Sequence, residues 1–161
     1  EAINQILALR QVTTSAAAHA LEHSLEVQLP FLQEVLGEFR LTPLAVGDTT
    51  PEAVAEVIEA LWGGPETLIV VSSDLSHYLP YQAAQHIDRQ TCAAIARFQT
   101  LDSHEQACGA TPVNGRLLAA RHHHLRPQLL DLRNSGDTAG DRERVVGYAA
   151  FAFTEEPGHA H

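Results

Sequence analysis

Apolar residues recur at helical spacing in several segments of the chain. The first predicted helix runs from Ala16 to Leu36 and is interrupted by Pro30. The second begins with Thr50 as its N-cap and Pro51 in its first turn, and extends to about residue 62. Two more long helices and one short helical piece share this spacing, at residues 81–98, 111–124 and 102–107.

Four shorter apolar runs between these helices predict strands, over residues 41–46, 67–71, 128–132 and 145–153. Residues 67–71 (TLIVV) are continuously apolar, which is typical of a strand buried on both faces. Strands that alternate with helices of this length indicate an α/β fold, with a mixed or largely parallel sheet flanked by helices. We expect a single domain over residues 1–154 and a tail over residues 155–161.

The composition excludes several classes of function. The 161 residues, of which 45% are hydrophobic, suit one globular domain. All 10 basic residues are Arg, against 20 acidic residues, and the formal net charge is −10. Without Lys the chain has neither a Schiff-base lysine nor a Walker-type phosphate loop, and its negative charge argues against binding nucleic acid.

The sequence gives no sign of export or membrane insertion. No apolar run approaches the roughly 20 residues that span a bilayer, and the N-terminus does not have the layout of a signal peptide. We therefore expect a cytoplasmic protein without a membrane partner. The chain contains no Met, so Glu1 is expected to be a processed or cut end.

The first histidine cluster, HALEH, lies in the first predicted helix. On a helix, His19 and His23 would be one turn apart on the same face and could reach one ion. This H-x-x-E-H pattern is that of inverted zinc peptidases, in which Glu22 would be the general base. The alternative is a helix start with exposed polar residues.

The second cluster, SSDLSHY, follows the predicted strand 67–71 directly. Ligands of open α/β sheets gather beyond the carboxyl ends of the strands, which makes Asp74 and His77 candidates for acid–base catalysis or for support of a metal ligand. The alternative is a helix-capping loop whose Ser and Asp side chains accept backbone hydrogen bonds.

The two cysteines allow at most one disulfide and have different surroundings. Cys108 precedes a predicted helix start, where the helix dipole favours a metal-bound or redox-active thiolate, although a small buried residue would fit equally well. Cys92, in the helical stretch TCAAIARF, is interpreted as a small buried residue.

Three successive histidines, His122 to His124, close the predicted helix 111–124. Successive helix residues point about 100° apart, so the three side chains do not converge on one ion while they are helical. A basic set near a helix C-terminus is the better interpretation.

Four segments in this order resemble the Memo family, whose bacterial and archaeal branch is called AmmeMemoRadiSam system protein B. They are AHALEHSLEVQLPFLQ, VVSSDLSHYLPY, CGATPVNGRLLAA and NSGDTAGDRERVVGYAAFAF. The resemblance implies a fold similar to class III extradiol (LigB-type) dioxygenases, which are non-haem iron enzymes with an α/β core.

In Memo-like proteins the metal site combines two histidines with a cysteine. Carried over onto the matching motifs, His23 and Cys108 are metal ligands, while Asp74 and His77 are pocket residues beside the metal. The other family histidine and the first strands of the sheet have no counterpart in this sequence. The chain is therefore expected to be a C-terminal piece of a longer protein or a degenerate member.

Three functions remain open. The first is a Memo-like metal site that binds Fe²⁺ or copper, with zinc less favoured, where Asp74 orients His77 as the acid–base group. Its chemistry would be oxidative, although a thiolate in place of the dioxygenase carboxylate argues against ring cleavage. The second is a module whose pocket binds a small molecule or a peptide, including a phosphopeptide, without chemistry. The third is H-x-x-E-H zinc hydrolysis. The family also implies a functional link to radical-SAM and AMMECR1-like proteins.

Overall fold

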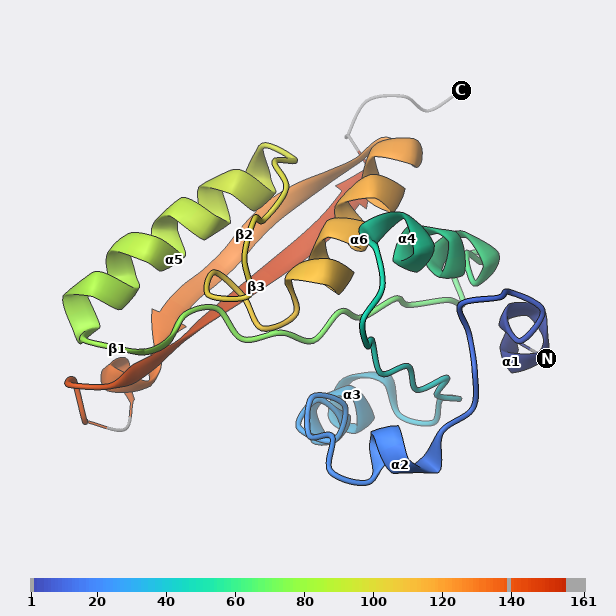
Figure 1. Cartoon of the computed structure of the whole chain (residues 1–161), viewed down its shortest axis with the longest axis horizontal. Coiled ribbons are helices and arrows are strands. Elements are labelled where there is room, and N and C mark those ends of the chain that lie inside the picture. Colours follow the sequence, from blue (N-terminus) through green and yellow to red (C-terminus); the bar gives the residue numbers. More distant parts are fainter. Residues whose placement is uncertain (1, 139, 156–161) are drawn as a thin grey trace.

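The central strand of the sheet is β3 (Val145–Glu155), which pairs with a neighbour on each side in the order β1-β3-β2 (Figure 1). The computed structural model describes residues 2–138 and 140–155. β2 (Leu125–Asn134) and β3 form a long antiparallel hairpin, and the short β1 (His77–Leu79) pairs antiparallel with the start of β3. The 3₁₀ turn η1 (Ser135–Asp137) follows β2 and is closed by a capping box of Asn134 and Asp137.

Three helices form where the capping and apolar patterns predict them. Thr50 accepts a hydrogen bond from the Ala53 N–H and so caps α4 (Pro51–Ala60). α5 (Tyr81–Ala96) buries residues at helical spacing along one face and packs across β2 and β3. α6 (Ala110–His122) packs against both α4 and β2, and its Gly115 lets α4 approach closely, because a Cβ there would meet Val54.

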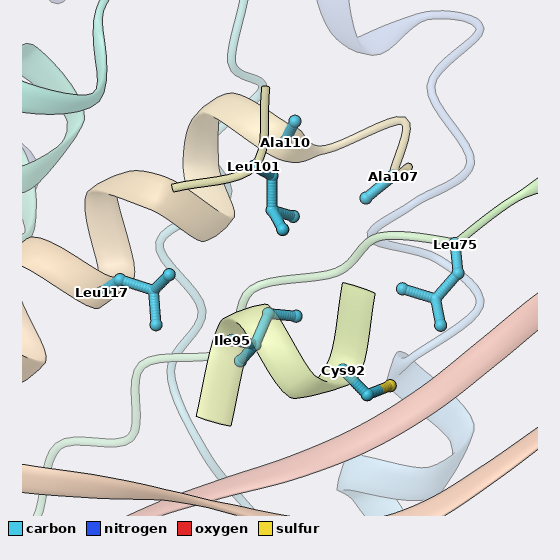
Figure 2. Packing of buried hydrophobic residues seen from close by; sticks show 7 residues of the cluster. All are labelled: Leu75, Cys92, Ile95, Leu101, Ala107, Ala110 and Leu117. Atoms are coloured by element: carbon cyan, nitrogen blue, oxygen red, sulfur yellow. The ribbon is translucent and has the colours of Figure 1, made fainter. Parts of the chain in front are cut away.

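The apolar core lies between α5, α6 and one face of the hairpin. In Figure 2, Ile95 of α5 lies beside Leu117 of α6, and Cys92 of α5 lies nearer to Leu75, from the loop before β1. The remaining members come from the connection between α5 and α6 and from the start of α6: Leu101, Ala107 and Ala110. Alternate β3 residues pack against it from the sheet: Ala149, Phe151 and Phe153.

The N-terminal third lies apart from the sheet and carries many exposed apolar side chains. α1 (Ala2–Ile6) contacts α4. α2 (Ala16–His19) and α3 (Leu29–Leu36) are separated from the hairpin by the long segment that connects α4 to β1 (Figure 1). The exposed large apolar residues of this region are Ile3, Leu7, Leu21, Val27, Phe31, Val35, Leu36, Phe39, Leu41, Leu44 and Val46.

Several predicted elements differ from the observed ones. The predicted helix 16–36 is divided, with turns between α2 and α3, and Pro30 lies in the first turn of α3, where proline is tolerated, instead of interrupting a helix. Residues 102–107 form turns. Residues 41–46 and 67–71 form no strand, because a strand needs a hydrogen-bonded neighbour and no described strand lies along either segment.

The fold is therefore mixed α/β, with helices flanking a small antiparallel sheet. A parallel pair does not occur among the described strands, so the largely parallel sheet is not observed in this part of the chain. None of the described helices is long and apolar enough to cross a bilayer. The expected tail lies outside the described residues, apart from Glu155 at the end of β3.

Gly147 provides a test of this packing. A Cβ at this position would overlap the carboxylate of Asp88, which is 1% exposed. We expect Gly147→Ala to lower the free energy of unfolding by about 1–3 kcal/mol or more, as overpacking does. Urea unfolding followed by circular dichroism measures this effect. Gly47→Ala is the matched control, because a Cβ there has nothing within 4 Å. Equal stabilities of the two variants would contradict the described packing.

Candidate metal centre

Backbone groups of the loop before β1 form hydrogen bonds with the backbone of β3 and with a side chain of α5. The Leu75 N–H donates to the Gly147 carbonyl at 2.8 Å, and the Gly147 N–H donates to the Ser76 carbonyl at 2.9 Å. The Ser76 N–H donates to Oδ1 of Asp88 on α5 at 3.0 Å. Asp74 and His77 therefore lie at the two ends of a short segment whose backbone is held in place.

Cys108 reaches this loop from the start of α6. The Asp74 N–H donates to Cys108 Sγ at 3.4 Å, and Ser73 Oγ lies 3.6 Å from the same sulfur. Ser73 Oγ also accepts a hydrogen bond from the Gly109 N–H at 2.9 Å. Cys108 Sγ is therefore held against the loop that carries Asp74.

Asp74, His77 and Cys108 form a cluster of three potential metal ligands. Their ligand atoms, one from each residue, all lie within 4.8 Å of one another. His77 Nε2 lies 3.4 Å from Asp74 Oδ2, so the carboxylate can orient the imidazole. Cys108 is exposed and the other two side chains are half-buried, which leaves the cluster open to a ligand from solution.

Two tyrosines near this cluster were not predicted as site residues. Tyr78 ends the segment SSDLSHY and Tyr148 lies in the segment VVGYAAFAF, and neither pattern by itself indicates a role for a phenol. Tyr78 adopts φ of 58°, a conformation that is uncommon for a residue with a side chain, at an irregularity in the pairing of β1 with β3. The pKa of Tyr148, on β3, is raised by burial and by the negative charge of Asp74.

His23 is not a member of either group of three ligand side chains among the described residues. Its side chain is 74% exposed, and its Nδ1 lies 2.5 Å from Glu26 Oε1. Its segment does reach the loop, because the Gln28 side chain donates to Ser72 Oγ at 3.0 Å. The role of His23 as a ligand stays a prediction.

The helix required by the zinc-peptidase interpretation is absent between His19 and His23. α2 ends at His19, so Glu22 is not part of a helix. Its side chain accepts a hydrogen bond from the Ser24 N–H. The two histidines therefore do not share one helix face, and the premise of the H-x-x-E-H interpretation is not met.

Fold and cluster together define a mixed α/β protein with a candidate cysteine-containing metal centre. The chain belongs to the Memo family, since the family described as "Memo-like protein" matches residues 1–152. Proteins named "MEMO1 family protein" are similar to it along most of its length. One from Metallosphaera sedula is 32% identical, covering 86% of this chain and 54% of that protein. One from Aeropyrum pernix is 37% identical, covering 82% and 52%. The chain thus spans about half the length of these curated relatives.

The two free cysteines should differ in reactivity. Burial, with a smaller contribution from the charge of Asp88, raises the pKa of Cys92 to about 11, whereas Cys108 is exposed. Because the thiolate is the nucleophile, we expect one thiol to react with a disulfide reagent at pH 8 in the native state and two after unfolding. Cys108→Ser should abolish the native reaction, and Cys92→Ala should leave it unchanged. Two reactive thiols in the folded protein would contradict this burial.

Proposed function

We propose that this protein binds Fe²⁺ or copper at Cys108 and that the bound metal supports oxidative chemistry on a small molecule or peptide. The observation that supports the proposal is the cluster of thiolate, imidazole and carboxylate donors within 4.8 Å of one another. A thiolate suits soft or borderline metals such as Cu(I) and Fe(II), and imidazole suits both. The residues present therefore fit a transition metal.

His23 is proposed as a further ligand. Its imidazole is exposed and is held only by Glu26, on the same segment. A rotation of the side chain would release it at little cost in buried surface. The hydrogen bond between Gln28 and Ser72 holds this segment against the loop that carries Asp74, which supports a role for His23 at the same centre.

The pair of Asp74 and His77 is proposed to handle protons. The carboxylate faces Nε2 of the imidazole, so it would favour the tautomer that carries its proton on that nitrogen. When bound, the metal would supply the redox chemistry. The substrate would enter from the solvent side, where Cys108 is exposed.

Metal binding can be assigned to Cys108 by a sulfur-specific signal. Co²⁺ bound to a thiolate gives a charge-transfer absorption in the near ultraviolet, which ligation by nitrogen and oxygen alone does not produce. We expect the full chain to show this band, Cys108→Ala to lose it, and His23→Ala to weaken Co²⁺ binding about tenfold or more, as changes around metal sites do. Bound Fe²⁺ and Cu⁺ are then measured by competition with Co²⁺.

His19→Ala is the matched control, since His19 lies four residues from His23 and is outside the proposed site. It should leave the band and the affinity unchanged. A band that survives in Cys108→Ala would contradict the proposal. Full protein that binds none of these metals would also contradict it and would favour a pocket that binds peptides without chemistry. Unchanged affinity in His23→Ala would remove His23 alone from the ligand set.

A further inference from the structure

A second cluster of ligand side chains lies where α4 and α6 end. Glu59 is in the last turn of α4, His122 is the last residue of α6, and His123 is the C-cap of α6. The sequence predicts that successive histidines diverge on a helix. The helix ends here, however, and His124 already has φ of 55°. The chain therefore leaves the helical path where His122 and His123 face the same carboxylate.

In this cluster both histidine side chains contact the same carboxylate, that of Glu59. His123 Nε2 lies 2.8 Å from Glu59 Oε2, and His122 Nδ1 lies 3.0 Å from Glu59 Oε1. The three ligand atoms all lie within 4.8 Å of one another. Glu59 Oε1 is buried and has no hydrogen-bond partner among the described residues, although His122 Nδ1 lies 3.0 Å from it. Such an oxygen can bind a cation.

The electrostatic surroundings favour a positive charge at this point. The last carbonyls of a helix carry partial negative charge, and the C-terminal ends of α4 and α6 both lie here.

The His123 ring is held in place before any ligand arrives. It stacks on the indole of Trp62, with ring centroids 3.6 Å apart and planes inclined by 4°. This contact fixes the ring plane while Nε2 faces Glu59. A ligand whose orientation is already fixed loses less conformational entropy when it binds a metal.

We infer that Glu59, His122 and His123 form a second metal site, which takes Zn²⁺ and links the C-terminal ends of α4 and α6. Two imidazoles and one carboxylate are a recognised zinc ligand set that leaves a fourth position to water. The site shares no residue with the Cys108 cluster and contains no sulfur. It would clamp the contact between the two helices, which is among the most extensive in the fold.

The single tryptophan of the chain reports on this site directly, because Trp62 touches His123. Cys108→Ala serves as the starting protein, so that the other cluster lacks its thiolate. We expect paramagnetic Co²⁺ to quench the Trp62 fluorescence, and Zn²⁺ to compete for the site and restore it. Glu59→Gln and His122→Asn should each weaken Co²⁺ binding about tenfold or more.

The matched control is His124→Asn in the same background. His124 is the neighbouring histidine, and Asn tolerates its positive φ. This variant should retain the affinity. If Glu59→Gln does not fold by circular dichroism, His122→Asn decides, because the His122 side chain is 72% exposed. Quenching that is equal in His122→Asn and His124→Asn would overturn the inference. Absence of quenching at millimolar Co²⁺ would also overturn it.

Discussion

The arrangement of the candidate metal centre depends on one buried carboxylate, that of Asp88. A carboxylate removed from water is costly unless hydrogen bonds replace its hydration. Asp88, on the inner face of α5, accepts a hydrogen bond from the Ser76 N–H. The loop before β1 therefore runs against that helix. Gly147 makes room, because any side chain there would overlap the carboxylate. The N–H and the carbonyl of Gly147 both form hydrogen bonds with the backbone of this loop, at Ser76 and Leu75. The orientation of Asp74 and His77 thus follows from a residue that belongs to no catalytic motif.

Cys108 is positioned by a second set of interactions. This set is connected to the loop before β1 through Ser73. Asn114 of α6 bonds the backbone of Leu101 through both its amide oxygen and its amide nitrogen, which fixes the connection between α5 and α6. Gly109 then approaches Ser73 so closely that a Cβ would lie 2.8 Å from the Ser73 Cβ. The thiol is therefore brought to the loop by contacts between residues more than 30 positions apart. Distortion of either set would separate Cys108 from Asp74 and His77.

Local signals in the sequence predicted the elements that local physics determines. Thr50 and Pro51 define the start of α4, and the apolar spacing indicates α5. The strand at residues 67–71 was predicted from its composition, but a ladder depends on a neighbouring strand, which a local pattern does not reveal. Asp74, His77 and Cys108 were predicted as site residues because they stand in motifs next to element ends. The structure brings their ligand atoms within 4.8 Å of one another, and their roles stay predictions. Tyr148 and Glu59 were missed, since their relevance arises only from contacts across the fold.

The two clusters differ in the physical origin of their donors, and this difference has a consequence for metal selection. The Cys108 cluster combines a polarisable sulfur with loop residues, whereas the Glu59 cluster has only nitrogen and oxygen donors at two helix ends. Soft thiolates select Cu(I), while imidazole with carboxylate suits Zn²⁺ under the same conditions. If both sites bind metal, the Cys108 cluster should prefer the softer ions and the Glu59 cluster should prefer Zn²⁺. The total metal content of the purified protein would then be the sum of two independent equilibria. For this reason, a metal is assigned to the Memo-like centre by a signal from the sulfur, and a metal at the helix ends by a signal from Trp62.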